Sequence, residues 1–135
     1  MKIFKRIALG ALATLVLYIF VTLGGAYKYL KEYGYGANYL PQTIAVYYGF
    51  NNGFTVSEND NSDISIFIGR HDYIYEELFS KYGYREIDRM GNLGYYGKGD
   101  DNSTETSFEI LSKPQWCHWF RLYSISNGYR IESFK

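Results

Sequence analysis

The chain of 135 residues has a single cysteine, Cys117, in the stretch QWCHWF. One cysteine cannot form an internal disulfide, so a small domain outside the cytoplasm would depend on its hydrophobic core for stability. No cysteine lies near the N-terminus, which excludes acylation of the lipoprotein type. We interpret Cys117 as a buried, unreactive thiol, and an intermolecular bridge is the alternative.

Histidine is also scarce, with one residue at His71 and one at His118. Cys117 and His118 are adjacent, and neighbours on a strand point to opposite faces, so they cannot pair as nucleophile and base. Asp72 follows His71 directly before a predicted helix, where an aspartate suits the N-cap, and no metal-ligand spacing accompanies the pair. We therefore expect no catalytic residue, no cofactor and no metal ligand.

Two polar stretches resemble ligand-binding loops only in composition. ENDNSD at 58–63 lacks the sixth-position glycine and the closing glutamate of an EF-hand. GNLGYYGKG at 91–99 holds Lys98, yet neither a Ser/Thr nor a helix follows, as a phosphate-binding loop requires. We expect these glycines to mark a turn and a bulge.

Residues 7–27 contain no Asp, Glu, Lys, Arg, His, Asn or Gln. A helix needs roughly 20 apolar residues to cross a bilayer. A cleaved signal peptide is an alternative, with Gly24 and Ala26 as the small residues before the cut, although its apolar stretch is usually about 7–15 residues. A buried core helix is disfavoured, because about 105 further residues cannot wrap it. We favour an uncleaved signal anchor that contacts the lipid bilayer through residues 7–27.

Basic residues indicate how this anchor is oriented. Lys2, Lys5 and Arg6 precede the run with no acid beside them, whereas Glu32 offsets the lysines that follow it. The positive-inside rule then places the N-terminus in the cytoplasm and the rest of the chain outside. We expect a single-pass protein of a bacterial cytoplasmic (inner) membrane with a periplasmic domain.

Beyond Leu30 the chain holds ten Lys and Arg against fourteen Asp and Glu. Nucleic-acid binding requires a basic face, so this balance argues against a nucleic-acid partner and against a domain lying flat on anionic lipid. Tyrosine is abundant, with 16 residues beside nine phenylalanines. Tyrosine enriches binding interfaces, but it also suits half-exposed sheet faces, and both readings stay open.

The predicted fold is α+β: one N-terminal transmembrane helix, then a small domain with a mostly antiparallel sheet of about five to seven strands and one packed helix. We assign residues 1–33 to the anchor and its extension, which Gly34 ends. Residues 34–42 form a linker, and residues 43–135 form the domain. The packed helix is predicted at 72–82, ends at Gly83, and covers one face of the sheet.

Alternating apolar residues predict the strands. Residues 43–50 are rich in β-branched and aromatic side chains and predict a strand, followed by an Asn52-Gly53 hairpin turn. Residues 64–69 predict a strand with its three isoleucines on one face, and further strands are expected at 84–90, 95–99 and 106–112. Asn127-Gly128, between alternating runs over 120–134, predicts a type I′ hairpin.

Three functions fit these features. We favour a membrane-anchored extracytoplasmic binding protein without catalytic activity. Its partner would be a protein of unknown identity. One form would be an immunity or exclusion factor that blocks an incoming toxin or phage component. An accessory subunit of a membrane complex is the first alternative, and an envelope-acting enzyme using carboxylates such as Asp72, Glu76 or Glu77 is the second. Exposed aromatics and loop charges supply the candidate protein-binding residues: Tyr95, Tyr96, Asp100, Asp101, Glu58 and Asp60.

Overall fold

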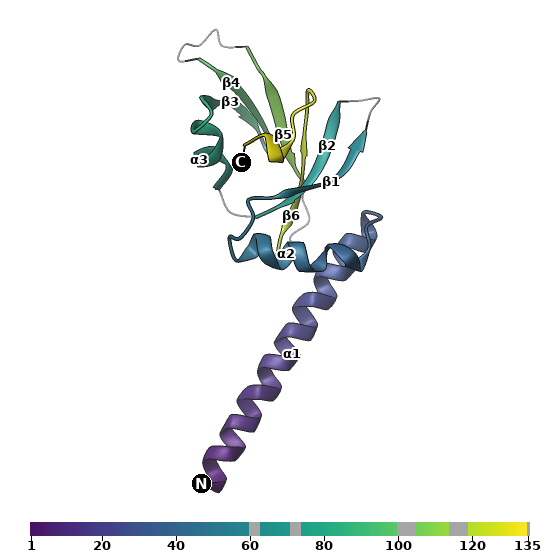
Figure 1. Ribbon diagram of the computed structural model, residues 1–135, viewed down its shortest axis with the longest axis vertical. Helices are drawn as coiled ribbons and strands as arrows, with labels where there is room; N and C mark the ends of the chain where they lie inside the picture. The colour runs from purple at the N-terminus through teal and green to yellow at the C-terminus, as the bar shows by residue number, and fades with distance from the viewer. Residues whose placement is uncertain (60–62, 71–73, 100–104, 114–118, 135) are drawn as a thin grey trace. The chain divides into compact units, whose positions relative to one another are not determined.

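The computed structural model describes residues 1–59, 63–70, 74–99, 105–113 and 119–134. The chain forms two compact units, residues 1–40 and 41–135, which are described separately. Its elements follow in the order α1 (Lys2–Glu32), η1 (Ala37–Tyr39), α2 (Leu40–Tyr47), β1 (Phe54–Asn59), β2 (Ile64–Gly69), α3 (Ile74–Ser80), β3 (Tyr84–Met90), β4 (Leu93–Lys98), β5 (Phe108–Ser112), β6 (Arg121–Ile125) and η2 (Ile131–Phe134). The α-helices and strands are labelled in Figure 1.

The first unit is dominated by α1, whose 31 residues give a helix of about 46 Å. It is long and apolar enough to cross a hydrocarbon core of about 30 Å. Within the helix the hydroxyls of Thr14 and Thr22 donate to the carbonyls of Gly10 and Tyr18, each at 2.9 Å. The predicted helix through the apolar run is confirmed.

α1 ends in a Schellman motif at Gly34, as the sequence predicts. Gly34 has a φ of +84°, and its N–H donates to the carbonyl of Lys31 at 3.0 Å. The N–H of Tyr35 donates to the carbonyl of Leu30 at 2.8 Å. These two bonds satisfy carbonyls that the helix end would leave unpaired. Residues 34–42, expected as a linker, contain η1 and the first turn of α2.

The strand predicted at 43–50 is wrong, because this segment belongs to α2 and the turn that ends it. Thr43 and Val46, three residues apart, are both fully buried, so they share one helix face. Pro41 lies in the first turn, where its missing N–H costs no hydrogen bond. The hairpin predicted at Asn52-Gly53 is therefore also wrong, since no strand precedes it.

The second unit contains one six-stranded sheet with the order β1-β2-β6-β5-β4-β3. Every neighbouring pair is antiparallel, which confirms the predicted α+β class. The strands predicted at 64–69, 84–90, 95–99 and 106–112 correspond to β2, β3, β4 and β5. The expected turn lies at Gly91, with a φ of +60°. The β3–β4 pair has a register shift, but it lies between Glu86 and Asp88 in β3 and not at the glycines of 91–99, where the bulge was expected.

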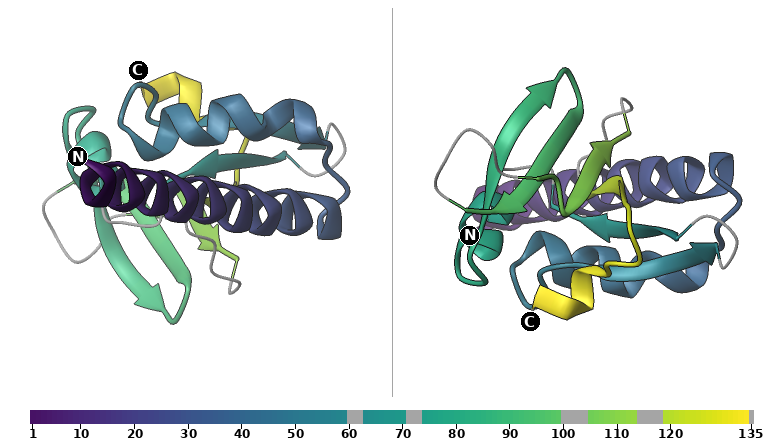
Figure 2. Two further views of the ribbon diagram at one scale, coloured as in Figure 1. Left: turned by 90° about the horizontal axis from the view of Figure 1, so that it is seen from below. Right: turned by 90° about the horizontal axis from the view of Figure 1, so that it is seen from above.

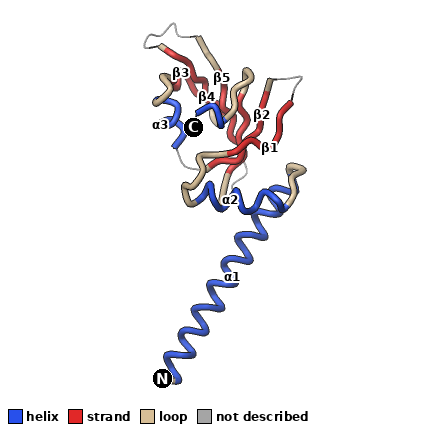
Figure 3. The backbone as a smooth tube through the Cα atoms, viewed as in Figure 1, coloured by secondary structure: helices blue, strands red, loops and turns tan. Residues whose placement is uncertain are grey.

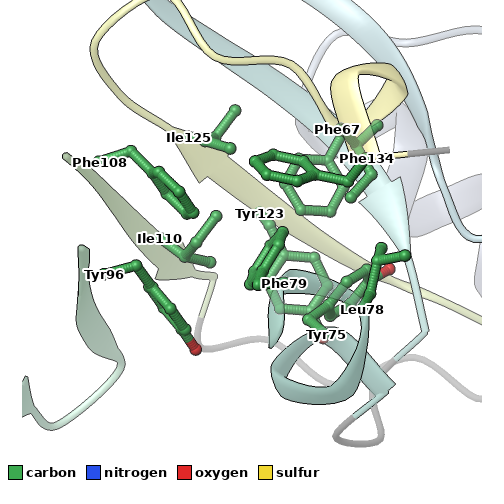
Figure 4. Packing of buried hydrophobic residues seen from close by; sticks show 11 residues of the cluster. Phe67, Tyr75, Leu78, Phe79, Tyr96, Phe108, Ile110, Tyr123, Ile125 and Phe134 are labelled. Carbon is green, nitrogen blue, oxygen red and sulfur yellow. The ribbon is translucent and has the colours of Figure 1, made fainter. Parts of the chain in front are cut away.

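One face of the sheet packs against α3 and η2 (Figure 4), as predicted for the helix. Phe79 of α3 lies at the centre of this core, with its ring centroid 5.2 Å from that of Phe108 and 4.7 Å from that of Phe134. Gly83, with a φ of +84°, follows the helix as expected. Tyr75 and Tyr123 are buried in the same cluster, so part of the tyrosine excess serves the core.

The turn at Asn127-Gly128 is confirmed, with φ values of +60° and +75°. The hairpin built on it is wrong, because the chain continues into η2 instead of a strand (Figure 3). β6 lies between β2 and β5, so both of its edges are already paired. Ile131 and Phe134, three residues apart, turn to the same side of the 3₁₀ helix and are both buried.

Candidate binding face

We call the face of the sheet opposite the core the open face. It carries a continuous row of side chains, which we call the open row. Residues directly opposite in neighbouring strands share a face. The register joins Ile66 to Ser124, Ser124 to Leu111, Leu111 to Leu93, and Leu93 to Met90, from β2 across to β3. Ile66, Ser124 and Leu111 alternate along their strands with core residues such as Phe67 and Ile110, so they point away from the core, and the register places Leu93 and Met90 on the same face.

The open row is largely apolar and accessible. Met90 is 67% exposed and Leu111 is 37% exposed, whereas Ile66 and Leu93 are half-buried. The same face is not accessible along its whole length. Ile68 and Leu122, which pair at the end of β2 near α2 (Figure 1), are fully buried. The open row is therefore apolar surface that the described part of the chain leaves uncovered.

Acidic side chains border the open row. Register pairs Asp88 with Tyr95 and Tyr95 with Glu109, which places these three residues in the next row of the same face. The hydroxyl of Tyr95 donates to the sulfur of Met90 at 3.7 Å, which joins the two rows. The backbone of Glu109 is fixed by its N–H, which donates to the Ser126 hydroxyl at 2.8 Å. An apolar strip with a carboxylate rim suits a partner surface of apolar and basic groups.

The structure places the sequence-predicted site residues in different surroundings. Tyr95 lies on the open face, but Tyr96 is 3% exposed and stacks on Phe108, so the expectation that it lies on the surface is wrong. Glu58 lies in the opposite edge strand, where it forms an ion pair with Arg130 at 2.6 Å, and it is not brought near Tyr95. Three predicted residues lie outside the described residues: Asp60, Asp100 and Asp101.

Sequence reasoning missed the residues of the open row. The sequence feature that indicates them is the adjacent apolar pair Ile110-Leu111 in β5. A strand that is apolar on both faces is typical of a sheet whose two faces are both covered. Met90 closes the charged stretch YREIDRM and gives no pattern of its own. Its place on the row follows only from its pairing with Leu93.

Ion pairs at the sheet domain join Glu86 to Arg89 and Glu58 to Arg130. Glu86 accepts two hydrogen bonds from the guanidinium of Arg89, each at 2.8 Å, and one from the Tyr96 hydroxyl at 3.2 Å. The Arg89 hydrogen bonds hold the pKa of Glu86 below its ordinary value, against the opposing effect of burial. Within the described ranges, no group of three or more His, Cys, Asp or Glu is placed to hold a metal ion. His71, Asp72, Cys117 and His118 lie outside those ranges.

The first unit presents a second candidate surface. α1 exposes large apolar side chains around its whole circumference, including Phe4, Leu12 and Phe20. A helix that is apolar on all sides requires an apolar environment, which a bilayer supplies. A signal sequence has the same character, so length and composition alone identify a helix able to span a membrane.

Comparison with protein-family models, curated proteins and solved structures finds no match to this chain.

Proposed function

We propose that this protein is a membrane-anchored binding module without catalytic activity, which holds a protein partner on the open row of its sheet. α1 anchors it in a bacterial cytoplasmic membrane. The observation that carries the proposal is the apolar strip from Ile66 to Met90, which is accessible in the described structure although the same sheet has a complete core on its other face. A contiguous accessible apolar strip is a candidate interaction site.

The basic residues at the start of α1 support the orientation. Lys2, Lys5 and Arg6 precede the apolar run, and all fourteen acidic residues follow it. The positive-inside rule then favours an N-terminus in the cytoplasm and a sheet domain outside. A blocking role against an incoming toxin or phage component is the specific form we favour, because it requires a binding face at the outer surface of the membrane.

The chemistry of the open face supports one kind of partner. Burying the exposed parts of Met90 and Leu111 would contribute on the order of 3 kcal/mol at about 25 cal/mol per Å². Asp88 and Glu109 at the border would favour basic groups around the partner's apolar contact and disfavour acidic ones. We therefore expect a protein that presents apolar side chains surrounded by Lys or Arg.

A photo-crosslinking amino acid at Leu111 tests the site in native host cells. The matched control carries the same amino acid at Glu76, an exposed residue of α3 on the core side of the sheet. We expect a discrete crosslinked protein from position 111 and none from position 76. Identical products from both positions, or no product from position 111, would contradict the proposed site.

A subunit of a membrane complex is the second candidate function. The observation in its favour concerns Gly10, Gly24 and Gly25. Among the described residues, and apart from the two chain neighbours of each glycine and the adjoining backbone of α1, no atom lies within 4 Å of the position that a Cβ would occupy, so another helix can approach closely there. In this case α1 itself would make the main contact with the partner, and the sheet domain would contribute less to binding.

A further inference from the structure

We propose that the turn after α2 docks on the headgroup region of the bilayer, through Tyr48 and Phe50. This inference rests on the proposed function in one respect only, namely that α1 spans that bilayer. The open row takes no part in it. The docking would give the sheet domain a second attachment to the membrane in addition to the covalent link to α1.

Phe50 is held in a fixed position and yet remains uncovered. α2 ends in a Schellman motif in which Gly49, with a φ of +82°, donates its N–H to the carbonyl of Val46 at 3.1 Å. The N–H of Phe50 donates to the carbonyl of Ala45 at 2.9 Å. The side chain at the Phe50 position of this motif commonly packs back on the helix. The Phe50 side chain is instead 86% exposed.

α1 ends in the same motif, which gives a comparison within one chain. Tyr35 occupies the position that corresponds to Phe50. It is half-buried, with its ring centroid 5.9 Å from that of Tyr39. The motif therefore allows its aromatic residue to be covered, so the exposure of Phe50 is a property of this turn and not of the motif.

Tyr48 lies close to Phe50 in the sequence and is 62% exposed. Its ring packs edge-on to Tyr47, with centroids 5.1 Å apart, and Tyr47 packs on the buried Trp119 at 4.8 Å. The exposed ring of Tyr48 therefore packs against an aromatic ring that is itself packed on a buried side chain. Amphipathic tyrosine rings and phenylalanine are the side chains that interfacial membrane segments present at headgroup level.

The charge distribution favours lipid as the occupant. From Tyr33 to Ser57 the sequence contains no Asp, Glu, Lys, Arg or His, although the chain beyond Leu30 is acidic overall. This segment can enter the interface without desolvating a charge of its own. The structure also places a cation close to the turn. A guanidinium nitrogen of Arg70 lies 3.6 Å from the position that a Cβ atom would occupy at residue 49, where the chain has glycine. A guanidinium is compatible with lipid phosphate groups.

The covalent chain also limits how far this turn can move from the bilayer. α2 begins at Leu40, and the segment from Glu32 at the end of α1 spans at most about 27 Å when fully extended. α2 adds about 12 Å. Tyr48 and Phe50 therefore stay at high local concentration near the surface that α1 crosses.

Depth-dependent fluorescence quenching tests the proposal with the full chain in phosphatidylcholine vesicles. A bimane probe is attached to Phe50→Cys, to Tyr48→Cys as a second variant, and to Met90→Cys as a matched exposed control, all in a Cys117→Ser background. A fourth probe at Leu17→Cys reports whether α1 is inserted. Quenchers are phosphatidylcholine spin-labelled near the headgroup, phosphatidylcholine spin-labelled deep in the acyl chain, and aqueous iodide.

We expect the probes at 48 and 50 to be quenched several-fold more by spin-labelled lipid, and less by iodide, than the probe at 90. Equal iodide quenching at 50 and 90 would overturn the inference, as would protection from iodide without quenching by lipid, which would indicate a second copy as the occupant. If the probe at 17 is deeply inserted while the probe at 50 gives either contradicting result, the docking inference fails but the membrane anchor of the proposed function stands. If the probe at 17 is not inserted, both the docking inference and the proposed membrane anchor are contradicted.

Discussion

Glu132 accepts two hydrogen bonds from Thr55, one from its backbone N–H and one from its hydroxyl, each at 2.6 Å. β1 is an edge strand of the sheet, and an unpaired edge N–H can pair with a strand of another chain. The η2 segment lies beside β1 (Figure 2), and its carboxylate occupies this donor. The C-terminal segment therefore occupies one donor at the edge of the sheet as well as filling the core.

Glu132→Ala should lower the free energy of unfolding by about 1–2 kcal/mol and promote self-association through β1, because the Thr55 N–H loses its charged acceptor. Urea unfolding in mild detergent, followed by near-UV circular dichroism, measures the first effect, and light scattering measures the second. Glu132→Gln is the matched control, since its amide oxygen can still accept one bond. Equal stability and equal scattering for Glu132→Ala and the unmodified chain would show that this edge contact is unimportant.

Phe79 should be among the most sensitive core positions. Its ring meets those of Tyr96 at 5.1 Å, Phe108 at 5.2 Å and Phe134 at 4.7 Å. Removing it leaves a cavity between α3 and the sheet, so Phe79→Ala should cost about 3–5 kcal/mol of unfolding free energy. The same urea titration measures this loss.

Tyr82→Ala is the control for Phe79, because Tyr82 is partly exposed and packs on Phe134 from outside the core. We expect a loss well below that of Phe79→Ala. Similar losses for both variants would mean that Phe79 has no central role in the core.

The Glu86–Arg89 pair predicts a specific pH dependence. The pKa of the Glu86 carboxyl is below its ordinary value of 4.5 in the folded chain. The contribution of this ion pair to stability is therefore fully present above that ordinary value, and is lost as the pH falls through the lower pKa of the folded state. Glu86→Gln should be less stable than the unmodified chain at pH 7, and the difference should shrink on acidification.

Urea titrations at several pH values between neutral and acidic measure this difference. Glu109→Gln, which removes a carboxylate from the other face of the sheet, controls for the change in net charge. A stability difference for Glu86→Gln that stays constant with pH would rule out the ion pair as its cause.

Local patterns were sufficient to predict much of the fold. The uncharged run predicts α1, Gly34 predicts its end, and the alternation in Ile64–Gly69 predicts β2. The C-terminal part of the chain was predicted less well, because β6 pairs with β2 and β5 and not with the residues that follow it. Such pairing is non-local, so Asn127-Gly128 indicates the turn without indicating what the next segment does.

The candidate site shows the same limit at single-residue level. Tyr95 and Tyr96 are adjacent and chemically identical, yet Tyr95 lies on the open face and Tyr96 is in the core. Which of two neighbours faces the core depends on the strand register, and a shift of one residue would exchange them. The helix over 40–47 was missed for a related reason, since β-branched residues also suit a helix face that tertiary packing buries.

Exchanging α1 for an unrelated membrane anchor, followed by crosslinking at Leu111 in intact cells, tests the central claim most directly. If the sheet domain is a binding module, the same partner should be captured with the native and the foreign anchor, and Met90→Asp should reduce capture with both. Loss of the partner with the foreign anchor, while Met90→Asp has no effect in the native chain, would contradict the account and identify α1 as the interface.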